Sequence, residues 1–190
     1  MTDRPAVDLT DPLALRAYAH PLRMSLVGLL RREGPLTATQ AANLLGESVP
    51  NCSFHLRQLA KYGLVERAEG ADAREKPWRA TALSTRWGRE SDDAETRAAV
   101  DQLDGVVIHR LYERALQWLA RRDADPPQWR AVTGPGDDLA YLTAEELGEL
   151  SRRIDDLFDA YRPRQTDPSL RPPGARPVHV GYYVTTIDQP

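Results

Sequence analysis

A chain of 190 residues with 41% hydrophobic residues is long enough to form one domain or a small pair with a real core, so disorder is not the expected state. No run of about 18 apolar residues occurs, and the acidic N-terminus lacks the apolar core of a secretory signal, so we expect a cytoplasmic protein without a membrane span. Cys52 is the only cysteine. It excludes an intrachain disulfide and any site built from several thiolates within one chain.

The net charge of −3 conceals a mild asymmetry along the chain. Residues 1–82 carry eleven Lys and Arg against nine Asp and Glu, whereas residues 83–190 carry fourteen against nineteen. The first part is therefore slightly basic and the second part acidic. This distribution permits a DNA-facing first part without requiring one.

The first part of the chain contains the signals for three short helices. Residues 13–33 carry leucines at helical spacing, and His20-Pro21 divides them because proline suits a first turn and disfavours helix at the residue before it. Thr37, followed three residues later by a glutamine, is a capping-box pattern, and Gly46 is a typical C-terminal stop. We therefore predict one helix on each side of His20-Pro21 and a third before Gly46.

Residues 48–62 are predicted to form a fourth helix, with a serine as N-cap and a proline in the first turn. Cys52, Leu56 and Leu59 fall at positions i, i+4 and i+7 and form the predicted buried stripe. Cys52 is therefore interpreted as a small buried hydrophobe. The stripe leaves a set of polar side chains for the outward face: Asn51, Ser53, His55, Arg57 and Gln58.

Two strands and a long helix are predicted next. Residues 64–67 and 78–83 have the composition of short strands and are joined by a polar, glycine-containing segment. Helices followed by such a hairpin are the order of a winged helix-turn-helix. From residue 92 to about residue 122 the apolar stripe is so broad that it needs cover on more than one side. We expect that cover to come from a second subunit or a following domain.

Beyond the long helix the sequence indicates a small α/β region. The segments QWRAVTG, DDLAYL and VHVGYYVTTI are predicted strands, and the last is expected to pair with DDLAYL. LTAEELGELSRRIDDLFDAYR is a predicted helix with Thr143 as its cap. The predicted fold class is mainly α with small β: a winged helix-turn-helix in residues 10–83, then a long dimerisation helix and a small α/β C-terminal region in residues 84–190.

Residues 15–82 resemble the ArsR-type winged helix-turn-helix regulators. The resemblance lies in AHPLRMSLVGLLRREGPLTATQAANLLGES, SFHLRQLAKYGLVERAEG and REKPWRAT, and most specifically in the H-L-x-x-L-x-x-x-G-L-V pattern from His55 to Val65. The later W-R, LTAEEL, RPV and YY elements resemble the C-terminal region of an actinobacterial set of that family. The resemblance implies a sequence-specific DNA-binding transcription regulator that acts as a homodimer.

The chain departs from the metal-sensing members of that family. Those members use cysteine pairs or clusters of histidine and aspartate, whereas this chain has one inward-facing cysteine. Its four histidines lack the spacing of metal ligands, so we expect neither a metal nor another cofactor: His20, His55, His109 and His179.

The fourth helix and the hairpin are the predicted DNA-binding elements, with residues 48–62 in the major groove and residues 67–79 on the backbone. Phe54 is expected either to meet a thymine methyl or the partner helix, or to be buried. Asp72 and Glu75 reduce the net positive charge of the hairpin, whose cations include Arg79. The candidate DNA-binding residues are Asn51, Ser53, Phe54, His55, Arg57, Gln58, Lys61, Arg74 and Lys76.

Other interpretations remain open at this stage. The winged helix can instead bind a protein partner, and Arg57 can instead form a surface pair with Glu47. An enzyme is not expected, because the sequence has no Gly-rich phosphate loop or nucleophile elbow, and Ser53 beside His55 lacks a third group to orient it. The aromatic residues of the later part form either core or a pocket for a small-molecule effector: Trp87, Tyr112, Trp118, Trp129, Tyr141, Phe158, Tyr182 and Tyr183.

Overall fold

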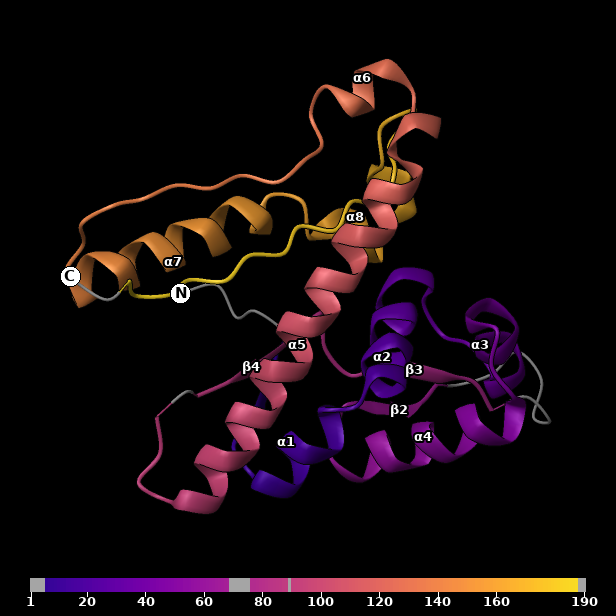
Figure 1. The fold of residues 1–190 in the computed structure, drawn as a ribbon. Helices are drawn as coiled ribbons and strands as arrows, with labels where there is room; N and C mark the ends of the chain where they lie inside the picture. Colours follow the sequence, from indigo (N-terminus) through magenta and orange to yellow (C-terminus); the bar gives the residue numbers. More distant parts are fainter. Residues whose placement is uncertain (1–5, 69–75, 89, 188–190) are drawn as a thin grey trace. The chain divides into compact units, whose positions relative to one another are not determined.

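The computed structural model describes residues 6–68, 76–88 and 90–187 of the chain. The fold consists of two units, Met1–Leu111 and Tyr112–Pro190, and the long helix α5 (Ala94–Arg121) belongs to both (Figure 1). Within the described ranges, every helix is either too short or too polar to cross a membrane.

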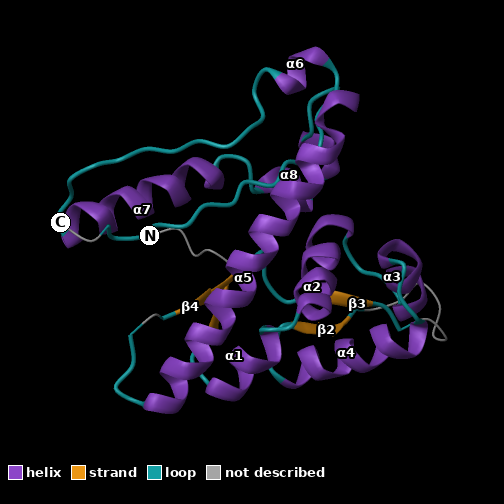
Figure 2. Cartoon of the chain, in the orientation of Figure 1, coloured by secondary structure: helices purple, strands orange, loops and turns teal. Residues whose placement is uncertain are grey.

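The first unit is a winged helix-turn-helix followed by the long helix (Figures 1 and 2). Helix α2 contacts α3, α4 and strand β3, and α4 also contacts α3 and strand β2, so the helices and the hairpin share one core. The elements before α5 are β1 (Ala6–Leu9), α1 (Pro12–Tyr18), α2 (Pro21–Glu33), α3 (Ala38–Leu45), α4 (Val49–Lys61), β2 (Val65–Arg67), β3 (Trp78–Ala80) and β4 (Ser84–Trp87).

The helix boundaries follow the capping signals in the sequence. His20 is the N-cap of α2, and its Nδ1 accepts a hydrogen bond from the Leu22 amide, so the predicted division before Pro21 is confirmed. Thr37 and its partner glutamine form both bonds of a capping box at the start of α3. Gly46 ends this helix with φ of 68°, a left-handed conformation that glycine adopts without strain.

Two small sheets complete the first unit. Strands β2 and β3 pair antiparallel and form the predicted hairpin, and Leu36 adds an isolated antiparallel bridge to Trp78. Strands β1 and β4 pair in parallel, from Ala6 opposite Ser84 to Leu9 opposite Trp87. This parallel pair was not predicted from the sequence, because it joins two four-residue segments from distant parts of the chain.

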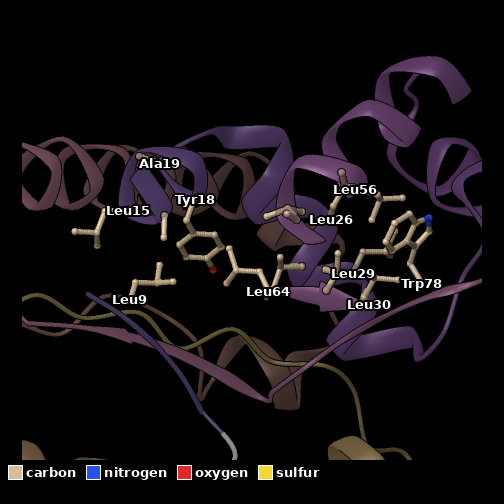
Figure 3. Close-up of a cluster of buried hydrophobic side chains, with 14 of the residues drawn as sticks. Leu9, Leu15, Tyr18, Ala19, Leu26, Leu29, Leu30, Leu56, Leu64 and Trp78 are labelled. Atoms are coloured by element: carbon tan, nitrogen blue, oxygen red, sulfur yellow. The ribbon is translucent and has the colours of Figure 1, made fainter. Parts of the chain in front are cut away.

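The core of the first unit is built from leucines of several elements (Figure 3). Cys52, Leu56 and Leu59 of α4 are fully buried, which confirms the predicted inward stripe of this helix. Fully burying a leucine contributes about 2 kcal/mol, so this stripe holds α4 firmly against the domain. The labelled core residues in Figure 3 are Leu9, Leu15, Tyr18, Ala19, Leu26, Leu29, Leu30, Leu56, Leu64 and Trp78.

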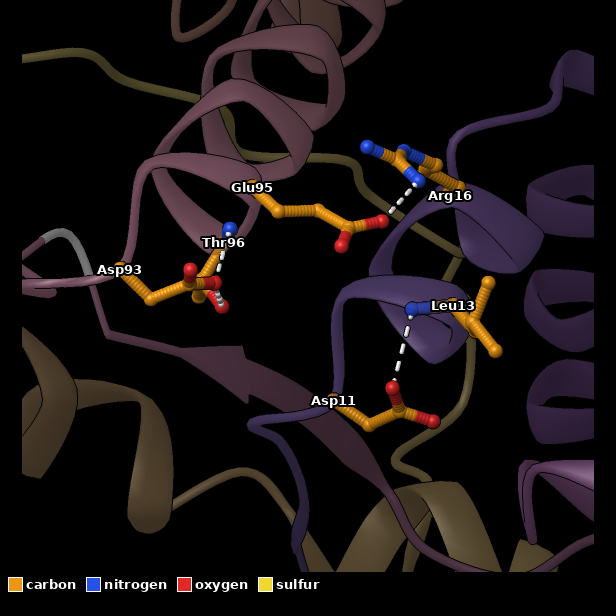
Figure 4. A network of polar contacts seen from close by, with 6 residues as sticks. All are labelled: Asp11, Leu13, Arg16, Asp93, Glu95 and Thr96. Atoms are coloured by element: carbon orange, nitrogen blue, oxygen red, sulfur yellow. Dashed lines mark hydrogen bonds and ion pairs between the residues drawn. The ribbon is translucent and has the colours of Figure 1, made fainter.

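Polar contacts attach the beginning of α5 to the first unit. The Asp93 carboxylate accepts from the Thr96 amide (2.8 Å) and hydroxyl (2.6 Å), an N-cap arrangement, and Glu95 forms an ion pair with Arg16 of α1 at 2.7 Å (Figure 4). Further along, the Arg110 guanidinium donates to the Pro21 carbonyl oxygen at the start of α2. Helix α5 is thereby held against α1 near its start and against the start of α2 at Arg110.

The second unit is helical in its described part. The predicted helix with Thr143 as its cap is confirmed as α7, including both bonds of the capping box. Its other elements are the short helices η1 (Arg122–Ala124), α6 (Pro127–Arg130), α8 (Pro163–Thr166) and η2 (Pro168–Leu170), while α7 spans Ala144–Asp159.

The prediction of strands in this second unit is wrong. QWRAVTG contains the last three residues of α6 and a turn, and neither DDLAYL nor VHVGYYVTTI contains a strand. Alternating apolar residues stabilise a strand only when a partner edge and a core cover one face. Here Tyr141 is 92% exposed and Tyr183 is exposed as well. The fold class of mainly α with small β is confirmed, and the small β part lies in the first unit.

Candidate nucleic-acid interface

Helix α4 presents a polar face opposite its buried stripe. Ser48 caps the helix by accepting from the Asn51 amide at 3.3 Å, which satisfies one of the amide donors of the first turn. Phe54, Arg57 and Lys61 are exposed. The remaining members of the face are half-buried: Asn51, Ser53 and Gln58.

Hydrogen bonds along the helix orient two of these side chains. The Arg57 guanidinium donates to Ser53 Oγ one turn earlier, at 3.2 Å. Asn51 Nδ2 donates to Glu47 Oε2 at 3.0 Å, so Glu47 bonds to the asparagine and not to the arginine. The alternative that Arg57 forms a surface pair with Glu47 is therefore not the arrangement observed.

Phe54 lies in the middle of this polar face. It is 47% exposed, and its ring meets the His55 imidazole edge-on with 5.2 Å between centroids. The alternative that Phe54 is buried is wrong. A half-exposed phenyl ring among donors and acceptors is available for apolar contact with a partner molecule.

His55 does not belong to the outward face. Its side chain is only 7% exposed, and its Nδ1 accepts from Arg23 Nε of α2 at 3.1 Å. The prediction that His55 faces outward is wrong because position 55 is three residues after Cys52, on the same side of the helix. A buried stripe drawn one residue wider would have included it.

Electrostatics keep this histidine neutral. Burial lowers the pKa of His55, and the nearby His20 and Arg23 lower it further, while Glu47 acts in the opposite direction. Burial and then Arg23 also lower the pKa of His20. Both rings therefore resist protonation near neutral pH.

The hairpin contributes a cation that the sequence did not single out. The Arg67 guanidinium lies 3.7 Å from the centroid of the Trp78 ring and donates to the Lys76 carbonyl oxygen. Burial lowers the pKa of Arg67, and the positive charge of Arg57 lowers it further. The positive charge of Arg57 on α4 therefore acts on Arg67 of the hairpin.

The other predicted hairpin cations differ in their surroundings. Lys76 is exposed. Arg79 forms an ion pair with Glu66 at 2.8 Å across β2 and β3, so its charge is matched within the hairpin. Arg74, Asp72 and Glu75 lie outside the described residues.

Two other kinds of site, a metal site and a catalytic Ser–His pair, lack the required arrangement of side chains among the described residues. Among the residues that the structure describes, no group of three or more His, Cys, Asp or Glu side chains is placed to hold a metal ion. Ser53 accepts from Arg57 and His55 accepts from Arg23, so the two bond to different arginines. In the second unit, the aromatic residues Tyr141, Tyr182 and Tyr183 are exposed.

Comparisons with known proteins identify the domain. Residues 18–68 match the family model described as "Helix-turn-helix domain", a span that runs from the end of α1 past β2. The chain therefore contains a helix-turn-helix domain.

Two solved structures show limited similarity to the chain. RV1404 from Mycobacterium tuberculosis is 18% identical, with 60% of this chain and 84% of that chain covered and a TM-score of 0.33. A mutant of MepR from a multidrug-resistant S. aureus clinical isolate is 15% identical, with 75% of this chain and 78% of that chain covered and a TM-score of 0.31. No curated protein matches the chain.

Proposed function

We propose that this protein is a sequence-specific DNA-binding transcriptional regulator of the ArsR type that acts as a homodimer. Helix α4 enters the major groove, and the wing, residues 67–79, lies on the backbone. The observation that carries the proposal is the outward face of α4, in a chain with a helix-turn-helix domain. Its members are Asn51, Ser53, Phe54, Arg57, Gln58 and Lys61.

This face suits the edges of base pairs. The major groove admits an α-helix, arginine pairs with guanine through two bonds, and asparagine or glutamine pairs with adenine in the same way. Arg57, Asn51 and Gln58 supply these groups, and Phe54 offers an apolar surface for a thymine methyl. The bond from Arg57 to Ser53 reduces the conformational freedom that Arg57 loses on binding.

The wing supplies the contacts that do not depend on sequence. Arg67 is the last residue of β2 and Lys76 lies two residues before β3, and the Arg67 guanidinium is held over the Trp78 ring. Cations placed beside a recognition helix neutralise phosphates and set the register of the protein on the duplex. Arg74 remains part of the proposed wing surface.

The apolar stripe of α5 supports the homodimer. Four large side chains recur on one side of its second half, and each is roughly half exposed: Ile108, Tyr112, Leu116 and Leu119. A second copy of the helix is a natural cover for such a stripe, and helix-turn-helix dimers read half-sites about one DNA turn apart.

Control by a small apolar or aromatic molecule at residues 123–190 is part of the proposal because of the aromatic residues there.

The test is a fluorescence-anisotropy titration of the full chain. A duplex enriched by the protein from a random-sequence pool is compared with an unselected duplex at two salt concentrations. We expect the enriched duplex to bind at least about a thousandfold more tightly, as specific sites do. Equal and weak binding of both duplexes would refute DNA recognition. It would favour the alternative in which the exposed Phe54 and its neighbours bind a protein partner.

A further inference from the structure

A partly buried polar cluster connects α1 and α2 to the buried His55 on the inward side of α4. One guanidinium makes two bonds: Arg23 Nε donates to His55 Nδ1 at 3.1 Å, and Arg23 Nη1 donates to the Ala17 carbonyl oxygen at 2.7 Å. The His20 ring lies beside the His55 ring, with 4.5 Å between centroids and a tilt of 38°. Three elements of the domain therefore meet at Arg23.

The protonation states in this cluster are set by its hydrogen bonds. His20 Nδ1 accepts from the Leu22 amide at 3.2 Å, and His55 Nδ1 accepts from Arg23. A ring nitrogen that accepts a hydrogen bond carries no proton, so each imidazole is neutral with its proton on Nε2. A proton added to His55 Nδ1 would face the Arg23 donor and break the bond.

The apolar stripe of α4 does not by itself set how the helix is rotated. Contacts of Cys52, Leu56 and Leu59 are non-directional, so small rotations of the helix change their burial little. A hydrogen bond weakens steeply when its angle changes. The Arg23–His55 bond therefore adds a directional contact that resists rotation of α4 about its axis.

We propose that Arg23 is a positioning residue for DNA recognition: by holding His55 and the Ala17 carbonyl with one guanidinium, it sets the rotation of α4 and hence which side chains reach the bases. Phe54 is tied to the same cluster through its edge contact with His55. The planar guanidinium suits this role because its donors have a fixed geometry, which a lysine ammonium lacks. The inference rests on the proposed function of α4.

Acidification supplies a second readout, provided that each affinity is corrected for the folded fraction at that pH. The charged or titratable groups that act on His55 are His20 and Arg23, which disfavour its protonation, and Glu47, which favours it. Protonation of His55 removes the acceptor for Arg23, so affinity for DNA should fall as the pH is lowered. A histidine on the DNA-facing surface would have the opposite effect, because an imidazolium attracts phosphates.

The experiment compares an enriched duplex with a random duplex for the parent and five variants. R23M removes the charge and both donors. R23K keeps the charge but lacks the planar guanidinium and the fixed geometry of its donors. H55N keeps an acceptor near the position of Nδ1 without titrating. The matched control is R32M, on the same helix, where the arginine is exposed and pairs only with its neighbour Glu33 among the contacts described. R57A reports on the base-facing side of α4.

We expect R23M and R23K to lose about tenfold in affinity for the enriched duplex, the scale of one charged hydrogen bond, with random-duplex binding changed less than about twofold. R32M should leave the ratio of the two affinities unchanged. Thermal melting and stoichiometric titration correct each value for the folded, active fraction. An unchanged ratio in both Arg23 variants would overturn the inference.

Binding measurements at several pH values test the inference even if the Arg23 variants do not fold. As the pH is lowered from about 7.5 to well below the ordinary histidine pKa of about 6.5, the parent should lose affinity for the enriched duplex, and H55N should lose less. The series extends that far because burial lowers the pKa of His55. A parent that binds more tightly on acidification, through His55, would overturn the inference. If the parent never discriminates between the duplexes, the proposed function fails. If it discriminates and R57A abolishes this while R23M does not, only the role of Arg23 fails.

Discussion

Replacing Arg57 by alanine tests the recognition helix most directly. Arg57 is exposed on α4, and its described hydrogen bond goes to Ser53 one turn earlier on the same helix. The R57A variant therefore removes little from the fold: a side-chain bond of this kind at the surface contributes about 1 kcal/mol or less. Helix propensity offsets part of that loss, because alanine is the best helix former.

The same substitution removes much more from a specific complex. An arginine that pairs with guanine through two bonds contributes about 1 to 3 kcal/mol of discrimination, which corresponds to a factor of about 5 to 150 in Kd. The loss should be confined to sequences with the preferred base at one or two positions. Binding to a random duplex should weaken by only a few fold, because one cation in the complex is lost.

The assay is competition anisotropy with a panel of single-base variants of the enriched duplex. R86A is the matched control, since Arg86 is an exposed arginine of β4, away from α4 and the hairpin in sequence. S53A adds a double-mutant cycle: if Ser53 orients Arg57 for the base, the two substitutions should couple by about 0.5 kcal/mol or more. Unchanged affinity and base preference in R57A would refute the assignment of α4 as the reading helix.

Three further outcomes are expected. Replacing Arg67 or Lys76 by alanine should weaken enriched and random duplexes about equally, and each should reduce the slope of log affinity against log salt by about one; an unchanged slope would remove that residue from the backbone contacts. L116E should convert a dimer into a monomer in light scattering, because a carboxylate in an apolar helix interface is left unpaired; a parent that is already monomeric at micromolar concentration would contradict the dimer. Burial lowers the folded-state pKa of His20 and His55 below the ordinary histidine value of about 6.5, so the unfolded chain binds more protons in this range. The contribution of these two histidines to stability is complete above about pH 6.5 and is lost as the pH falls through the folded pKa values; urea unfolding at several pH values should show a shallower decline in H55N, and an equal decline would exclude His55 as its source.

Local signals were enough to place the helices and the hairpin of the first unit. The capping box at Thr37, the serine cap before α4 and the proline after His20 each act within one helical turn, so the sequence contains all of their partners. The inward stripe of α4 was predictable for the same reason, because residues three and four apart share a face of any helix. The winged helix-turn-helix order followed from these elements.

Only the tertiary structure decided which polar residues belong to the candidate interface. His55 lies on the side of α4 that Cys52 already marks as buried, but its bond to Arg23, 32 residues earlier, follows only from the tertiary fold. Arg67 is held over Trp78 because the hairpin register places the two opposite each other. Two further features also depend on residues far away in the sequence: the parallel pairing of β1 with β4, and the absence of strands from DDLAYL and VHVGYYVTTI. In each case the alternating or helical pattern shows which face a side chain takes. The partner that stabilises a side chain on that face lies far away in the sequence, where no local pattern reports it.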